Sequence, residues 1–165
     1  MSEPVTLRFA TAEDVGLILR LVRELALFER APNEVVATEA ELRRYGFESE
    51  PPEYEALLAF IGDEPAGMAL FHKRFSTWVG RPCLYLEDLY VTERARGRGV
   101  GRRLLTRLAK IAVERSWGRI DFQVLDWNPA RDFYAHLGMS HIAEWLRYGA
   151  ASDALQRLAR LDEPG

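Results

Sequence analysis

Residues Arg96 to Gly101 read Arg-Gly-Arg-Gly-Val-Gly, between an apolar strand pattern and a long amphipathic helix pattern. The three glycines let the backbone approach a ligand closely, because no Cβ stands in the way. The helix that follows would offer unpaired N–H groups and the positive end of its dipole. Full positive charge comes from five arginines: Arg94, Arg96, Arg98, Arg102 and Arg103. This combination predicts a site for a polyanion, most simply a pyrophosphate.

Other nucleotide-binding loops share only part of this pattern. A P-loop ends in Gly-Lys followed by Ser or Thr, which this loop lacks. A GxGxxG dinucleotide fingerprint would use Gly97 and Gly99, but its third glycine position is Arg102. Asp121 follows at about the distance that fingerprint asks, yet it begins the next predicted strand rather than ending it. A dinucleotide site is therefore a weak alternative, and a glycine turn before a solvated basic helix is the purely structural one.

The composition limits the classes of protein. The 165 residues suit one domain with its own core, and 48% hydrophobic and 28% charged residues are ordinary for a globular chain. The net charge of −3 gives no basic field for general nucleic-acid binding. No apolar run reaches membrane length, and no signal-peptide pattern opens the sequence. We therefore expect a single domain over residues 1–165, in the cytoplasm, with no nucleic-acid or membrane partner.

The residues that commonly bind metals are few and scattered. Cys83 is the one cysteine, which excludes an internal disulfide framework and a cysteine-based zinc cluster. It lies just before an apolar strand, so we expect a buried or half-buried thiol rather than a nucleophile. His72, His136 and His141 show neither metal-binding spacing nor a nucleophile partner. We expect no metal site, and structural or surface positions for these four residues.

The hydrophobic pattern alternates between strand and helix periods. Before residue 80 it predicts a strand over 6–9, a helix to about Glu29, a helix from Thr38 to near Gly46, and a hairpin of strands 54–61 and 66–75. Capping boxes at 11–14 and 38–41 open the two helices. After residue 80 it predicts strands over 84–91, 120–125 and 141–148, and helices from Val100 to near Trp117, from Pro129 to Gly138, and over 151–161. This order predicts a mixed α/β sheet with helices on its faces.

The glycine loop also resembles a known family. Arg96-x-x-Gly99-x-Gly101 is similar to the acetyl-CoA loop of the GNAT superfamily of N-acetyltransferases. From Arg8 to about Leu137 the chain resembles the diamine acetyltransferases, the spermidine/spermine and thialysine branch. The other matching motifs are Ile18-Leu19-Arg20-Leu21, Arg23-Glu24-Leu25-Ala26, Leu84-Tyr85-Leu86-Glu87-Asp88, Val124-Leu125-Asp126-Trp127-Asn128 and Phe133-Tyr134. The resemblance implies a mixed, mostly antiparallel central sheet with helices on both faces.

The family's reaction moves an acetyl group from acetyl-CoA to a primary amine by direct attack in a ternary complex. A lysine-like amine has a pKa of about 10.4, so making it neutral at pH 7 costs about 4–5 kcal/mol. By the family pattern Glu87 is the base acting through water, and Asp88 lies beside the amine. Successive strand residues face opposite sides, so both reach one site only if the strand bends or bulges. A bulge here is what the resemblance implies, whereas a cap or a surface ion pair is the structural alternative for Asp88.

The resemblance also implies the other residues of the site. Tyr134 matches the acid that protonates the departing thiolate, although Phe133-Tyr134 is also ordinary core packing. The coenzyme would be held by the backbone of Leu89, Tyr90 and Val91, by the loop residues Arg96, Gly97, Arg98, Gly99, Val100, Gly101 and Arg102, and by Asn128. Asn128 stands in a loop that is one residue shorter than the family's.

The acceptor side is implied by three further positions. Glu29 matches a carboxylate that receives the distal cationic end of the substrate, with a solvated surface charge as its structural alternative. Trp78 lies in Ser76-Thr77-Trp78, the reading of thialysine-type enzymes, whereas polyamine enzymes carry an aspartate at the position of Ser76. We therefore expect a small lysine-like or diamine acceptor.

The resulting prediction is an acetyl-CoA-dependent N-acetyltransferase that acts on a small-molecule amine without a metal. The resemblance also implies a homodimer. Two alternatives stay open: an acetyltransferase for protein lysines or N-termini, and a non-catalytic acyl-CoA-binding module.

Overall fold

The computed structural model describes residues 3–162, which form two compact units that divide between Leu125 and Asp126. The first unit contains a five-stranded sheet in the order β1-β2-β3-β4-β5. Its strands are β1 (Val5–Phe9), β2 (Glu55–Ile61), β3 (Glu64–Ser76), β4 (Arg81–Val91) and β5 (Ile120–Asp121). The first four strands pair antiparallel with their neighbours, and β5 pairs in parallel with β4. The predicted mixed, mostly antiparallel sheet is confirmed.

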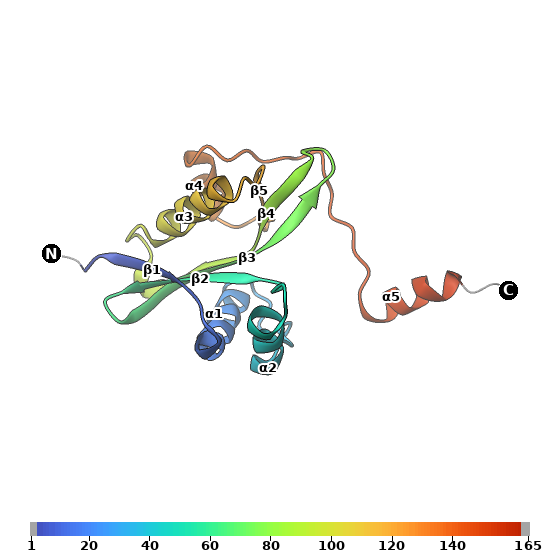
Figure 1. Ribbon diagram of the computed structural model, residues 1–165, viewed down its shortest axis with the longest axis horizontal. Coiled ribbons are helices and arrows are strands. Elements are labelled where there is room, and N and C mark those ends of the chain that lie inside the picture. Colours follow the sequence, from blue (N-terminus) through green and yellow to red (C-terminus); the bar gives the residue numbers. More distant parts are fainter. Residues whose placement is uncertain (1–2, 163–165) are drawn as a thin grey trace. The chain divides into compact units, whose positions relative to one another are not determined.

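Helices cover both faces of this sheet, as Figure 1 shows for the first unit. On one face lie α1 (Val15–Phe28) and α2 (Glu39–Arg43), which continues into a π-helical turn, η2 (Arg44–Glu48). The apolar stripe of α1 packs on the strands, where Ile18, Leu21 and Leu25 share a buried cluster with Met68 and Leu70. On the other face α3 (Val100–Glu114) buries its own stripe. Helices on both faces, as predicted, are therefore confirmed.

The capping boxes lie where the sequence predicts them. The backbone N–H of Thr11 donates to the Asp14 carboxylate at 2.7 Å, at a 3-10 turn (η1, Ala12–Asp14) that leads into α1. The N–H of Thr38 donates to the Glu41 carboxylate at 2.9 Å, and the Thr38 hydroxyl accepts from the Glu41 N–H at 3.2 Å. Each box satisfies N–H groups that a helix start leaves unpaired.

Two of the predicted strands differ from the structure. The strand predicted over 120–125 is only two residues long, because only Leu84 and Tyr85 of β4 pair with it. The strand predicted over 141–148 is wrong: these described residues are irregular and all exposed. A strand needs a neighbour that completes its hydrogen bonds, and an apolar alternation alone does not provide one.

The second unit contains the helices α4 (Ala130–His136) and α5 (Ser152–Ala159), followed by a 3-10 turn, η4 (Arg160–Asp162). Both helices lie within the predicted ranges, and Gly138, with φ of +80°, follows the end of α4. None of residues 126–162 is buried. Over residues 3–162, the helices are too short or too polar to cross a membrane.

Candidate active site

The strand β4 carries a bulge at Glu87. Leu70 of β3 lies opposite Asp88, and the next residue of β3, Phe71, lies opposite Leu86. Glu87 is therefore the extra residue on β4. A bulge bends its strand and re-aims the side chains beside it. The bulge that the resemblance implied is confirmed by this register.

The bulge brings two adjacent carboxylates to the same face of the sheet. Asp88 is opposite Leu70, a member of the buried cluster under α1. The Oε2 atom of Glu87 lies 3.5 Å from Nε2 of His72. His72 is two residues after Leu70 on β3 and so points to the same face. Glu87 and Asp88 therefore share the α1 face, which a regular strand would not allow.

A third carboxylate joins them from the end of α1. Glu29 is the C-terminal cap of that helix, and burial raises the pKa of its carboxyl. Burial, followed by the negative charges of Glu87 and Glu29, raises the pKa of Asp88 to about 6. Both other carboxylates thus repel the Asp88 carboxylate, which lies beside an apolar cluster. Such a site favours a bound proton or a bound cation.

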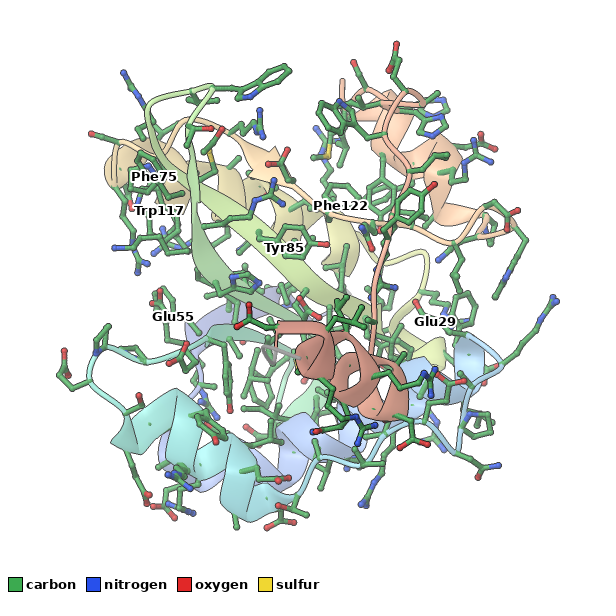
Figure 2. The ribbon with its side chains drawn as sticks, turned by 90° about the vertical axis from the view of Figure 1, so that its right-hand side faces the viewer. Glu29, Glu55, Phe75, Tyr85, Trp117 and Phe122 are labelled. Carbon is green, nitrogen blue, oxygen red and sulfur yellow. The ribbon has the colours of Figure 1, made fainter. Side chains whose placement is uncertain are left out.

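The imidazole of His72 belongs to the same group of side chains. Its ring lies 5.1 Å from the ring of Tyr85, its partner across the β3–β4 ladder. The Arg74 guanidinium lies over the Tyr85 ring, 5.6 Å from its centroid. Figure 2 labels Tyr85 on β4 and Glu29 at the end of α1. The sequence reading placed His72 among the structural or surface residues. Only the strand register, which sets His72 beside the bulge, could have indicated its contact with Glu87.

The glycine loop leaves β4 through a 3-10 turn, η3 (Glu93–Ala95), and enters α3 at Val100. Gly97 and Gly99 adopt φ of +77° and +79°, which L side chains rarely adopt, and a Cβ added at either position would meet no atom within 4 Å. The hydrogen bonds of residues 3–162 do not use the backbone N–H groups at positions 97, 99, 100, 101 and 102. These donors, at the positive end of the dipole of α3, can bind an anion.

The arginines of the loop divide into two groups. The Arg96 guanidinium lies 5.0 Å from the centroid of the Phe28 ring on α1, and its Nε donates to the Val91 carbonyl at 3.4 Å. Arg103 donates to the Val5 carbonyl of β1 at 3.3 Å. These two side chains fix the loop and α3 to the rest of the unit. The other three are exposed and available to a ligand: Arg94, Arg98 and Arg102.

The C-terminal half of β4 has an open edge within residues 3–125. Leu89, Tyr90 and Val91 pair with β3 on one side. On the other side β5 reaches only Leu84 and Tyr85. The remaining backbone groups on that edge can pair with an extended amide chain.

The other predicted site residues lie elsewhere in the chain. Trp78 is in the turn between β3 and β4 and is 84% exposed. In the second unit, the Asn128 side-chain oxygen accepts from the N–H of Ala130, the first residue of α4, at 2.9 Å, and Tyr134 on this helix is half-buried. The residues that the structure brings together are therefore Glu29, Glu87 and Asp88.

The described residues contain no group of three or more His, Cys, Asp or Glu side chains arranged to hold a metal ion. Cys83 is buried at 1% exposure, as its position before an apolar strand predicts.

Comparison with known proteins places the chain in a family. Residues 20–139 match the Acetyltransferase (GNAT) family. A thialysine N-epsilon-acetyltransferase of Bos taurus is 36% identical over 94% of this chain and 97% of its own length. An L-ornithine N5-acetyltransferase of Arabidopsis thaliana is 29% identical over 94% of this chain and 88% of its own length. The solved structure of an integron cassette protein from V. cholerae covers 97% of this chain and 99% of its own, with a TM-score of 0.79 and 28% identity. The chain therefore belongs to the GNAT family of acetyltransferases and is an N-acetyltransferase.

Proposed function

We propose that this enzyme transfers an acetyl group from acetyl-CoA to the terminal primary amine of a small diamine or lysine-like acceptor, by direct attack in a ternary complex. The proposal rests on one observation: Glu29, Glu87 and Asp88 lie close together on the face of the sheet that α1 covers. Three carboxylates beside an apolar cluster attract a cationic amine, and the cation in turn relieves the repulsion that Glu87 and Glu29 exert on Asp88. The names of the relatives agree, since thialysine and ornithine both end in a primary amine.

The proposed donor site is the glycine loop together with the open edge of β4. The free N–H groups at positions 97 and 99 to 102 and the exposed arginines fit a pyrophosphate. The backbone of Leu89, Tyr90 and Val91 would pair with the amides of the pantetheine arm. Asn128 would add a coenzyme contact through its amide nitrogen, because its side-chain oxygen already accepts from the Ala130 N–H.

The proposed reaction begins when Glu87, acting through a water, takes a proton from the ammonium group of the acceptor. The neutral amine then attacks the thioester carbonyl carbon. A C–N bond forms, the C–S bond breaks, and the nitrogen's remaining extra proton goes to solvent. Tyr134 donates its phenolic proton to the departing thiolate and regains one from solvent. The products are the N-acetylated amine and free coenzyme A.

The end of the β3–β4 hairpin supports a small acceptor. Ser76 is buried, and its hydroxyl accepts from the Val79 N–H at 3.3 Å, so its role is to hold the turn. A serine here adds no negative charge for a second or third cationic group. With Glu29 as the partner of the distal charge and Trp78 in the turn, the site suits a short molecule better than a long polyamine.

Three further properties belong to this proposal. Residues 1–165 act as one catalytic domain, which agrees with a family match that crosses the boundary between the two units. The protein is a homodimer in the cytoplasm. Light scattering after size-exclusion chromatography tests whether the protein is a homodimer. Cell fractionation tests whether it is in the cytoplasm.

The test is an acetyl-transfer assay that follows thiol release from acetyl-CoA and identifies the product by mass spectrometry. Acceptors are thialysine, ornithine, lysine, a short diamine, spermidine and an N-terminal peptide. We expect turnover with the short amines, and a 10²- to 10⁴-fold lower kcat, roughly, for Glu87→Gln. Exclusive acetylation of the peptide would support a protein acetyltransferase. Tight acetyl-CoA binding without turnover on any amine would support the non-catalytic module.

A further inference from the structure

We propose that Arg74 binds the carboxylate of the amine substrate, so that the enzyme selects a lysine-like amino acid over the corresponding diamine. The inference rests on the proposed function and narrows its substrate class, because a diamine and a lysine-like amino acid carry the same reacting amine. It concerns a residue to which the family pattern assigned no role in the site.

Arg74 lies on the face of the sheet that carries the three carboxylates. Side chains alternate along a strand, so Arg74 of β3 points to the same face as His72, whose Nε2 is 3.5 Å from Oε2 of Glu87. Tyr85, labelled in Figure 2, is the partner of His72 across the β3–β4 ladder, and the two rings are 5.1 Å apart. The Arg74 guanidinium is 5.6 Å from the centroid of the Tyr85 ring. Contacts between neighbouring side chains therefore lead from Glu87 to this guanidinium.

The Arg74 guanidinium is available to an anion. Arg74 is exposed, and within the part of the chain that the structure describes it takes part in no ion pair. The cation–π contact with Tyr85 restrains the guanidinium but provides no oxygen acceptor for its five N–H donors. A planar guanidinium matches the two oxygens of a carboxylate. Arg74 can therefore bind a carboxylate that the protein itself does not supply.

The charges along this face suit a molecule with an ammonium group at one end and a carboxylate at the other. Glu29, Glu87 and Asp88 provide negative charge at the reacting end, and Arg74 provides a fixed positive charge beyond Tyr85. A diamine would bring a second ammonium group, with charge +1, towards the guanidinium, which repels it. The α-carbon end of an amino acid carries both an ammonium group and a carboxylate, so its net charge is zero and the carboxylate can pair with Arg74.

The spacing along the strands also suits a lysine-like molecule. Asp88 is opposite Leu70 and Tyr85 is opposite His72, so the two positions of β4 are two residues of β3 apart, about 7 Å along the strand. An extended ornithine or lysine places its terminal amine roughly 6–8 Å from its carboxylate carbon, for bonds of standard length. Both ends of the substrate can therefore be bound at once, one near Asp88 and the other at the guanidinium over Tyr85.

The test measures kcat and KM for matched substrates that differ in the carboxylate. The pairs are lysine with cadaverine and ornithine with putrescine, and 6-aminohexanoate adds a substrate with a carboxylate but no α-amine. Arg74→Gln should raise the KM for the three carboxylate-bearing substrates on the order of 5- to 10-fold, with kcat little changed. The KM for the two diamines should stay equal or fall. Arg74→Glu should reverse the preference, because its charge attracts the second ammonium group and repels the carboxylate.

Two further variants control for charge and for geometry. Lys73→Gln removes an equal charge from the neighbouring exposed residue, whose side chain points to the opposite face, and should leave the ratio of the lysine and cadaverine KM values unchanged. Arg74→Lys keeps the charge but loses the planar fork, so its KM for lysine should lie between those of wild type and Arg74→Gln. Because the readout compares two substrates on one enzyme, a partial loss of folded protein cancels. A wild-type ratio in Arg74→Gln would overturn the inference.

A binding measurement keeps this inference distinct from the proposed function. In ¹⁵N NMR spectra, 6-aminohexanoate should move the Nε signal of Arg74, which is assigned by its absence in Arg74→Gln. Hexylamine, which has no carboxylate, should not move it. If no small amine is acetylated but the signal moves, the proposed function fails while the carboxylate site stands. If 6-aminohexanoate does not move the signal, the inference fails even in an active enzyme.

Discussion

The two units of the chain differ in how their residues are held. In the first unit, side chains such as Leu58, Leu104 and Phe71 are completely buried between the sheet and its helices. In the second, no residue from 126 to 162 is buried. Many of its large apolar side chains are instead exposed: Trp127, Ile142, Trp145, Leu146, Tyr148, Leu155, Leu158 and Leu161.

This difference determines what each unit can contribute to the chemistry. The charge of Asp88 depends on tertiary packing, because burial is the largest cause of its raised pKa. Tyr134, in contrast, is placed by a seven-residue helix whose turn is fixed by local bonds, such as the Met139 N–H to the Tyr134 carbonyl at 3.1 Å. Substitutions in the first unit should therefore change stability and activity together. Those in the second unit should change activity without changing stability.

The largest expected effect is on turnover, in Tyr134→Phe. A phenol with a pKa of about 10 can protonate a departing thiolate, and the phenyl ring that replaces it cannot. We expect kcat to fall about 100-fold or more, while the Kd of acetyl-CoA and the free energy of unfolding stay close to wild type. Steady-state kinetics, calorimetric titration and urea unfolding measure the three quantities.

Tyr148→Phe is the control for this substitution, since Tyr148 is 90% exposed in the same unit. It removes the same hydroxyl group from a position outside the proposed mechanism. An unaltered rate in Tyr134→Phe would remove Tyr134 from the mechanism, and equal losses in both variants would show a general effect of the tyrosine hydroxyls.

The next effect is on stability, in a pair of leucine truncations. Leu104→Ala, at 0% exposure on α3, should lower the free energy of unfolding by about 2–5 kcal/mol. Leu158→Ala, at 59% exposure on α5, should change it by less than about 0.5 kcal/mol. Urea unfolding measures both. A loss above about 1 kcal/mol for Leu158→Ala would contradict the comparison, because it would place α5 in a packed interface.

Asp88→Asn should stabilise the protein at neutral pH. The folded state raises the pKa of Asp88 from 3.8 to about 6, so ionising this group opposes folding by about 3 kcal/mol at most. Below pH 4 the Asp88 carboxyl is protonated in both the folded and the unfolded state, so it does not oppose folding. Between pH 4 and 6 the folded state binds more protons than the unfolded state, so wild-type stability falls as the pH rises. Above pH 6 the carboxyl is ionised in both states, and the stability of the wild-type protein no longer falls through this group.

The difference in unfolding free energy between Asp88→Asn and wild type should therefore be largest at pH 7 and vanish near pH 4. Asp63→Asn, in an exposed turn, is the matched control. The variant should also have a raised KM for the amine, since one of the three carboxylates is lost. A constant difference across this pH range would show that Asp88 does not carry the effect.

The sequence predicted those features that depend on local patterns. Capping residues and helical periodicity located α1 and α3, and the turn at Gly62 located the β2–β3 hairpin. Features set by distant partners were harder to predict. The strand predicted over 141–148 has apolar residues but no neighbouring strand, and β5 stops where its pairing with Tyr85 ends.

The candidate site shows the same division. The acidic residues Glu87 and Asp88 were found from their resemblance to a family motif, and the bulge that aligns them was implied by it. The contact between Glu87 and His72 was missed, because two residues 15 positions apart meet only in one register of the β3–β4 ladder. A single sequence contains no direct signal for that register.

The smallest expected effect concerns two glycines, one in each unit. Open space surrounds both Gly99 and Gly149, so an added Cβ meets no atom at either position. Their backbones differ: Gly99 has φ of +79°, whereas Gly149 is not left-handed. Gly99→Ala should therefore cost about 1 kcal/mol of stability and weaken acetyl-CoA binding, because the strain falls on the loop whose N–H groups we propose as the pyrophosphate site. Gly149→Ala should leave the Kd of acetyl-CoA unchanged and stability equal or slightly higher. Urea unfolding and calorimetric titration distinguish the two. Equal responses would mean that the left-handed turn before α3 does not shape the proposed coenzyme site.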